Sequence, residues 1–194
     1  MRSTVYVSEN CLATLIASCL EVPHKEAGGF LIGKEDKRFV AGERIGCLTL
    51  DAAYPIRTCK SGKGFWQPAN TRAYKRIIGT INAIGFNIVG EYHSHISNVA
   101  ELSDEDKEFI EQEIKDLEKD EVGITSWIEM VLNIEPKSYS RKPRRGFQCS
   151  YFSKKIRCTV KGIRDPLKGY SITIGSYWFD PKTSSYEEAV VRVP

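Results

Sequence analysis

The stretch that decides the fold is EYHSH at residues 91–95, which is followed after a short gap by SDED at residues 103–106. Two of the chain's three histidines lie in it, separated by one residue. In a β-strand, residues i and i+2 point to the same face with Cα atoms about 7 Å apart, so His93 and His95 can converge on one cation. A helix that begins after the gap would bring Asp106 back over the end of the strand. Two histidines and one carboxylate leave a fourth tetrahedral position open, which is typical of a catalytic zinc site.

Length and composition indicate one domain over residues 1–194. A chain of 194 residues can bury a core without disulfides or a structural metal. Hydrophobic residues make up 41% and charged residues 27%, close to the averages of globular proteins. No apolar run approaches the roughly 20 residues that span a bilayer, so we expect a cytoplasmic protein with no membrane partner.

The six cysteines are widely spaced and include no C-x-x-C pair. This spacing favours reduced thiols in a cytosol over a disulfide framework. A second zinc site remains an alternative, although the spacing of a zinc knuckle is missing. It would use Cys47, Cys59, Cys149 and Cys158.

Hydrophobic periodicity over the first 135 residues indicates strands that alternate with helices. The expected helices cover residues 8–20 with Ser8 as N-cap, the segment from Pro68 to Gly85, and residues 103–119 with Ser103 as N-cap. The expected strands cover residues 4–7, a glycine-punctuated segment ending at residue 33, and residues 40–50, 86–95 and 125–134.

Two loops and a strand-rich tail complete the predicted organisation. A charged turn is expected at residues 34–38 and a mobile loop at residues 57–67. The tail, from residue 147 to residue 193, is broken by Asp-Pro pairs at residues 165–166 and 180–181. We predict that its strands extend or flank the main sheet.

The net charge of +3 hides an asymmetry. Residues 101–121 carry eleven acidic and three basic side chains. The densest basic run consists of Lys137, Arg141, Lys142, Arg144 and Arg145. Aromatic residues for base stacking are sparse in this run, which favours a solvated loop and argues against a nucleic-acid partner.

A zinc site that cleaves amide bonds also needs a proton carrier, because protons must pass from water to the leaving amine. Several carboxylates could take this role on spacing alone. Glu91 shares a strand face with His93 but lies a full pleat further from the metal. Ser103, as an N-cap near Asp106, could donate a hydrogen bond to a tetrahedral oxyanion.

The spacing His93-x-His95-x(7)-Ser103-x(2)-Asp106 matches the signature of the JAMM metalloproteases, the MPN-plus domain family. The segment EAGGFLIG at residues 26–33 resembles that family's upstream Glu-x-x-Gly-x-Leu-x-Gly element. The resemblance implies that His93, His95 and Asp106 hold zinc, that Glu26 is the general acid/base, and that Ser103 stabilises the oxyanion.

The same resemblance implies a fold and a substrate. It covers roughly residues 3–135 and implies an α/β fold, the three-layer α/β/α arrangement of the cytidine-deaminase type with a mixed central sheet. The tail at residues 147–194 would be an extra, strand-rich extension. The implied activity is hydrolysis of a peptide or isopeptide bond after the C-terminal tail of a ubiquitin-like protein, as in bacterial sulfur-carrier or antiphage conjugation pathways.

Two departures from the family pattern leave the subfamily and the substrate open, because Ile96 and Leu102 stand where many members have Pro. The alternative of a different class is a non-catalytic MPN-type scaffold, or a module that docks nucleic acid through the basic loop at residues 137–145. Scaffold members have lost the metal ligands that this chain keeps. Phe65 and Trp66 are candidates for gripping an extended peptide substrate.

Overall fold

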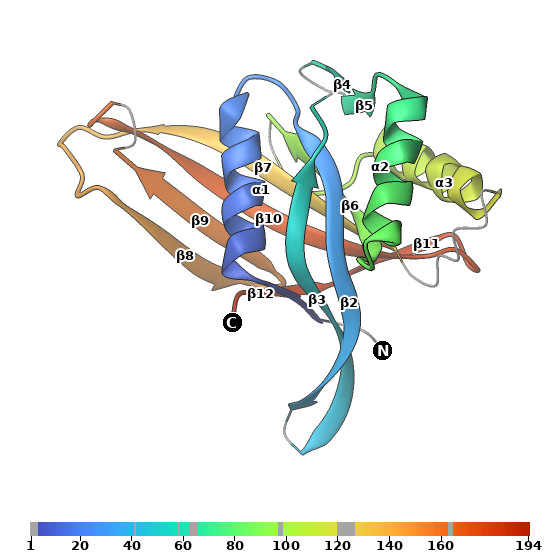
Figure 1. The fold of residues 1–194 in the computed structure, drawn as a ribbon. Coiled ribbons are helices and arrows are strands. Elements are labelled where there is room, and N and C mark those ends of the chain that lie inside the picture. The colour runs from blue at the N-terminus through green and yellow to red at the C-terminus, as the bar shows by residue number, and fades with distance from the viewer. Residues whose placement is uncertain are drawn as a thin grey trace.

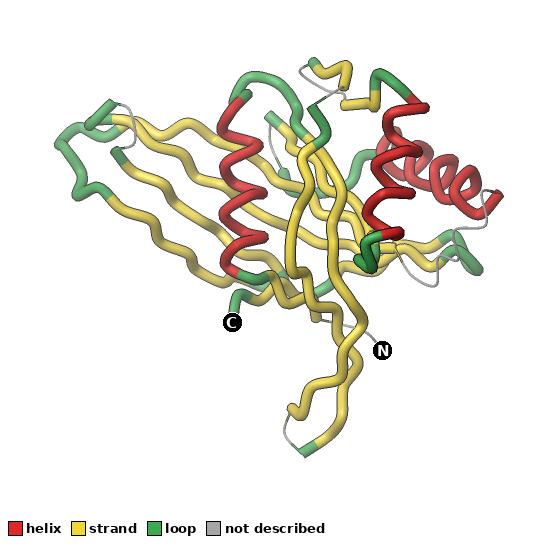
Figure 2. The backbone as a smooth tube through the Cα atoms, in the orientation of Figure 1, coloured by secondary structure: helices red, strands yellow, loops and turns green. Residues whose placement is uncertain are grey.

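The structure is a computed structural model that describes residues 4–40, 42–57, 59–62, 66–96, 99–119, 127–162 and 165–194. It is a mixed α/β fold in which one curled, ten-stranded mixed sheet carries few helices (Figures 1 and 2). The strands follow the order β12-β1-β3-β2-β6-β7-β10-β9-β8, and β11 pairs with β10. Their bounds are β1 Thr4–Val7, β2 Gly28–Val40, β3 Glu43–Pro55, β6 Ile88–His95, β7 Trp127–Ser138, β8 Gly146–Phe152, β9 Lys155–Lys161, β10 Lys168–Asp180, β11 Ser185–Glu188 and β12 Val190–Arg192.

The first helix, α1 (Glu9–Glu21), forms as predicted. The Ser8 hydroxyl oxygen accepts a hydrogen bond from the Cys11 N–H at 3.2 Å, which satisfies one of the unpaired donors at the helix start. Its buried residues are Cys11, Leu12, Leu15, Ile16 and Cys19. This single apolar face attaches α1 to the sheet.

The hairpin formed by β2 and β3 is longer than predicted and projects beyond the rest of the sheet (Figure 1). The expected turn at residues 34–38 is wrong, because these residues pair with residues 45–49 of β3. Residues 34–37 are exposed. A two-stranded ribbon with solvated side chains accepts a polar run as readily as a turn does, so composition could not separate the two.

The segment before the second helix is more ordered than the predicted loop at residues 57–67. A small two-stranded sheet forms there, in which β4 (Cys59–Ser61) pairs antiparallel with β5 (Trp66–Pro68). Phe65 lies outside the residues that the structure describes.

The second helix, α2 (Thr71–Ala83), begins later than predicted because Pro68 ends a strand. Asn70 is its N-cap, with the side-chain oxygen accepting a hydrogen bond from the Ala73 N–H at 3.1 Å. Gly85 follows the helix with a φ of +85°, as its predicted role in ending the helix requires.

The third helix, α3 (Asp104–Lys119), begins with a reciprocal capping box. The Ser103 hydroxyl oxygen accepts a hydrogen bond from the Asp106 N–H at 3.1 Å, and the Asp106 carboxylate accepts one from the Ser103 N–H at 2.8 Å. The two residues that the sequence motif marks for chemistry therefore also fix the start of the helix.

The helices lie on both faces of the sheet. Phe30 of β2 packs in one apolar cluster with residues of α2 and α3, whereas its neighbour Leu31 packs in a second cluster with residues of α1. Successive residues of a strand point to opposite faces, so α1 and the other two helices cover opposite sides of β2. None of the helices in the described parts of the chain is long and apolar enough to cross a membrane.

The tail extends the main sheet, as predicted. β10 pairs with β7, β9 pairs with β10, and β8 forms the edge. β12 returns to the opposite end of the sheet and pairs in parallel with β1. The Val191 N–H of β12 also donates to the Lys154 carbonyl at 2.8 Å. The sheet therefore curls until its last strand meets the turn between β8 and β9.

The prediction of reduced thiols is wrong for two of the six cysteines, because Cys149 and Cys158 form a disulfide. These residues lie directly opposite each other on β8 and β9, with Cα atoms 4.2 Å apart. A search for C-x-x-C spacing does not find partners that meet across a hairpin. The disulfide also removes both cysteines from the alternative zinc site with Cys47 and Cys59.

Candidate metal centre

The three predicted metal ligands meet where the end of β6 faces the first turn of α3. His93 Nε2 and His95 Nε2 are 3.0 Å apart, and oxygens of Asp106 lie 3.5 Å from the first and 3.3 Å from the second. Ligand atoms about 2.05 Å from a tetrahedral zinc are about 3.3 Å from one another, so these separations fit such an ion. Within the described residues, these three side chains form a group that could hold a metal ion.

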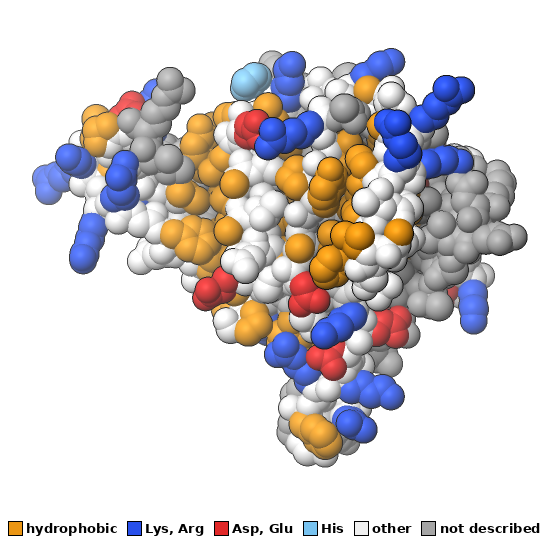
Figure 3. Space-filling model, viewed as in Figure 1, with side chains coloured by type: hydrophobic (Ala, Val, Ile, Leu, Met, Phe, Trp, Pro, Cys, Tyr) orange, Lys and Arg blue, Asp and Glu red, His pale blue; other side chains and the backbone are white. Residues whose placement is uncertain are grey.

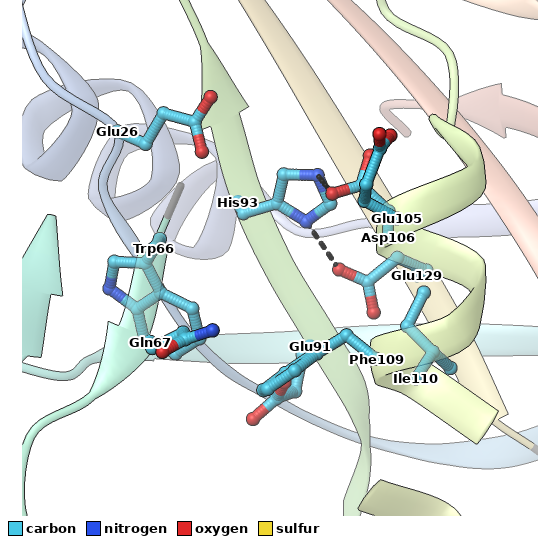
Figure 4. A pocket seen from close by; sticks show the side chains of 10 residues that line it. All are labelled: Glu26, Trp66, Gln67, Glu91, His93, Glu105, Asp106, Phe109, Ile110 and Glu129. Atoms are coloured by element: carbon cyan, nitrogen blue, oxygen red, sulfur yellow. Dashed lines mark hydrogen bonds and ion pairs between the residues drawn. The ribbon is translucent and has the colours of Figure 1, made fainter. Parts of the chain in front are cut away.

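The second ring nitrogen of His93 forms a hydrogen bond with a residue that was not predicted from the sequence. Its Nδ1 lies 2.8 Å from Oε1 of Glu129, which projects from the neighbouring strand β7 (Figure 4). Metal-ligating histidines usually donate their second ring N–H to such a group, which fixes the tautomer and the ring orientation. Burial disfavours the charged imidazole, but Asp106 and Glu129 outweigh it and raise the pKa of His93 to about 10.

Glu129 belongs to a buried acidic pair. It lies opposite Glu91 across β6 and β7, and Tyr74 of α2 donates a hydrogen bond to Glu91 at 2.6 Å. Burial and the neighbouring Glu129 raise the pKa of Glu91 well above its ordinary value. The sequence offered one indication of this buried pair, namely a single acidic residue inside each of two predicted apolar strands.

Asp106 is held in place by the capping box and by both histidines. Burial opposes its ionisation, but hydrogen bonds with His93 and His95 and the Ser103 N–H hold the pKa of Asp106 well below its usual range. The carboxylate is therefore ionised and ready to bind a cation at any pH near neutrality.

Glu26 reaches the site through a different connection. The neighbouring Ala27 N–H donates to the Ser94 hydroxyl at 2.9 Å, and the Ser94 N–H donates to the Ala27 carbonyl at 2.8 Å. Ser94 points away from the metal ligands, yet it ties the Glu26 segment to the strand between them. Figure 4 shows the Glu26 carboxylate directed toward His93, on the side opposite Asp106. Burial raises the pKa of Glu26 above its ordinary value, and the nearby histidines offset part of this rise.

A cavity of about 90 Å³ is lined by Glu26 and by two of the candidate ligands, His93 and Asp106. Its lining residues include Glu26, Trp66, Gln67, Glu91, His93, Asp106 and Glu129. The Trp66 ring lies against Gly28, where an added Cβ would come within 2.7 Å of it. Of the two predicted substrate contacts, Trp66 thus lines the cavity, although it is largely buried.

Ser103 is exposed at the edge of the site. Its oxygen serves as the acceptor of the helix cap, but a hydroxyl keeps its own hydrogen for donation. The predicted oxyanion role is therefore chemically available to Ser103 while it caps α3.

No known protein family matches this chain, and no curated protein does. Among solved structures, the fold is similar to the solution structure of protein DSY2949 from Desulfitobacterium hafniense, with a TM-score of 0.51. The match covers 98% of this chain and 92% of that one, at 13% sequence identity. A likeness at this level of identity concerns the fold alone.

Proposed function

We propose that this protein is a zinc-dependent metallopeptidase of the JAMM type that cleaves the bond after the C-terminal tail of a ubiquitin-like protein. The observation that carries the proposal is the convergence of His93, His95 and Asp106 at separations suited to tetrahedral zinc, with Glu26 across the same cavity. The sequence motif and the three-dimensional cluster select the same three ligands. Glu26, 67 positions before His93 in the sequence, lines the cavity beside them.

Each residue has a defined task in this proposal. A bound zinc would supply an acidified water and polarise the scissile carbonyl. Glu26 accepts a proton from the attacking water and returns it to the leaving amine; burial raises the pKa of Glu26 and so makes it a better proton acceptor. Ser103 donates its hydroxyl hydrogen to the developing oxyanion, and Glu129 keeps the imidazole of His93 oriented.

The family's three-layer arrangement is part of the proposal. In this view α1 would form one outer layer, α2 and α3 the other, and the strands after residue 138 would be an addition to the central sheet. The placement of helices on opposite sides of β2 supports this correspondence.

The test uses metal analysis together with cleavage of a fusion in which a ubiquitin-like protein is followed by a short peptide. The wild-type protein should carry close to one equivalent of zinc. Glu26→Ala should keep zinc and lose about 10²-fold or more in turnover, as expected for a missing general acid/base. His95→Ala should lose both zinc and cleavage.

Glu21→Ala is the matched control, because Glu21 is an exposed carboxylate at the end of α1 and should be silent in both assays. Full cleavage by the Glu26→Ala variant would disprove the assignment. A wild-type protein that binds no zinc would favour the non-catalytic scaffold.

A further inference from the structure

One end of the molecule carries a strong excess of positive charge. Residues 136–168 include eleven lysines and arginines and one acidic residue. The structure gathers this segment into β8, β9 and the loops at the tips of β7 and β10, at the opposite end of the molecule from α3 (Figure 1). Figure 3 shows Lys and Arg side chains standing out at this end. Such a concentration of one sign attracts polyanions.

The strand register places some of these cations on the sheet face that carries the metal ligands. Residues directly opposite each other on neighbouring strands share a face. One such row runs from β6 through β7 and β10 to β9 and consists of His95, Asn133, Thr173 and Arg157. Lys161 lies four residues after Arg157 and shares its face by strand periodicity.

The helices leave this part of the face open. The apolar cluster that seats α2 and α3 includes residues of β2, β7 and β10, but within the described chain it includes none from β8 or β9. β8 is exposed at every residue, and Arg157 is exposed beside it. The side chains between the cations are polar and are contributed by Gln148, Ser150, Thr159 and Ser171.

Few carboxylates compensate these cations. Lys137 pairs with Glu135 at 2.6 Å and Lys168 with Asp165 at 3.8 Å. Lys155 pairs with Glu101 at 2.9 Å and with Glu188 at 3.8 Å. In the described parts of the chain, Arg141, Lys142, Arg144 and Arg157 form no ion pair with an acidic side chain. We call the following residues the basic face: the exposed Arg157 and the half-buried Lys161 of β9, and the exposed Arg141, Lys142 and Arg144 of the loop between β7 and β8.

The basic face also includes a stacked aromatic ring. The Arg157 guanidinium lies 4.7 Å from the centre of the Phe152 ring, and Phe152 is 38% exposed. An exposed ring beside a guanidinium offers a surface on which a nucleic-acid base can stack.

The composition of the surface distinguishes between two kinds of anionic partner. A protein–protein interface needs an apolar, aromatic-rich centre depleted of charge. Protein–nucleic acid interfaces are more polar and much more positively charged. The basic face has polar residues at its centre and uncompensated arginines and lysines around them, which matches the second kind.

Sparse aromatic residues in the basic run of residues 137–145 argued against a nucleic-acid partner, but β8 and β9 add the ring of Phe152 beside Arg157. We propose that the basic face binds nucleic acid through its phosphates, without dependence on sequence. Bound nucleic acid would then lie on the same sheet face as His95, with β7 and β10 between them. The binding would concentrate the protein near nucleic acid and near proteins already attached to it. This proposal does not depend on the metal centre being a peptidase.

The test is fluorescence anisotropy of the intact protein with a short labelled DNA strand, titrated over a range of salt concentrations. Wild-type affinity should fall steeply with salt, with a log–log slope of about −0.7 per neutralised phosphate on a single strand. The triple variant Arg141→Glu, Arg144→Glu, Arg157→Glu should lose at least about tenfold in affinity and about two to three units of that slope.

The matched control is the triple variant Lys60→Glu, Arg72→Glu, Arg76→Glu, which changes net charge equally at exposed positions of β4 and α2. It should bind within about threefold of wild type at physiological salt, where distant charges are screened. Thermal melting checks that both variants are folded. Equal losses in the two variants, or a wild type that does not bind, would overturn the proposal. Equal affinity for polyglutamate and DNA would assign the face to an acidic protein instead.

Discussion

Two histidines of the same motif differ in burial and in hydrogen-bond partner, because His93 lies further inside β6 than His95 does. At the centre, His93 is 8% exposed and its Nδ1 is 2.8 Å from the buried Glu129 carboxylate. At the end, His95 is less buried and its Nδ1 is 3.4 Å from the backbone carbonyl of Val99, which is at the limit of a hydrogen bond. The strand spacing makes the two residues equivalent, but their surroundings fix the ring of His93 more firmly than that of His95.

This difference shows which contacts fix the orientation of each histidine ring. His93 is oriented by a side chain that is itself buried between strands, so its position is set by the packing of the sheet. His95 depends on Asp106 and on the chain that follows the strand. We therefore expect changes at the strand centre to have larger effects than changes near its end.

The largest effect is expected from Gly90→Ala, which would break the strand centre directly. A Cβ at Gly90 would lie 1.8 Å from the Ile128 carbonyl oxygen, so β6 and β7 would have to move apart. We expect a loss of about 3 kcal/mol or more in the free energy of unfolding, measured by urea denaturation. Gly79→Ala is the control, since no atom lies within 4 Å of that Cβ. This helical change should stabilise the protein by about 0.5–1 kcal/mol. Equal behaviour of the two variants would contradict the packing of the strand centre.

The next effect tests the support of His93 alone. Glu129→Gln keeps the shape of the side chain but removes the charge that receives the Nδ1–H. Loss of such a partner typically costs 10- to 100-fold in metal affinity, so we expect zinc binding to weaken by about that factor in a chelator competition. Glu135→Gln, at a half-buried position of β7 six residues further along, should leave the affinity unchanged. Unaltered binding by Glu129→Gln would mean that the two histidines are equivalent after all.

The pH dependence of metal binding is a further test of the difference between His93 and His95. With a pKa raised to about 10, His93 is protonated in the metal-free protein at neutral pH and must release that proton to bind zinc. Zinc affinity should therefore rise about tenfold per pH unit between about pH 6 and pH 8. Calorimetry in buffers of different ionisation enthalpy should detect the released proton. Without metal, protonated His93 stabilises the fold fully below its ordinary pKa of 6.5, and this stabilisation is lost as the pH rises toward about 10.

The smallest effect concerns the placement of Glu26. Ser94→Ala leaves the Ala27 N–H without its acceptor, so we expect a loss of about 1–2 kcal/mol in stability. Turnover should fall while zinc content stays at one equivalent, because Glu26 shifts and the ligands do not. Ser150→Ala, on the exposed strand β8, should change neither quantity. Loss of zinc in Ser94→Ala would show that Ser94 supports the ligands instead.

The parts of the fold that local rules govern could be predicted from the sequence. Ser8 and Ser103 each cap a helix at the expected position, because capping depends on a few neighbouring residues. The clustering of His93, His95 and Asp106 was predictable for the same reason, since strand parity and one helical turn place the three side chains. Glu26 came only from the family resemblance, because a contact across 67 positions leaves no local pattern.

The main failures involve the register between neighbouring strands. The disulfide of Cys149 with Cys158 and the support of His93 by Glu129 depend on which residues face each other across neighbouring strands. Register is set by the whole sheet and is not readable from one strand. The shifted start of α2 is a milder case, in which Pro68 suits the end of a strand as well as the start of a helix.

The pairing of β1 with β12 has a consequence for the order of folding. It joins Thr4 to Val190, so the first strand cannot find this neighbour until nearly the whole chain exists. Contacts so distant in sequence carry the largest loop-closure entropy and are expected to form late. The elements that carry His93, His95, Asp106 and Glu129 lie between residues 88 and 138, and two of them, β6 and β7, pair directly. During synthesis on a ribosome, His93, His95, Asp106 and Glu129 can therefore come together before β12, the partner of β1, has been made.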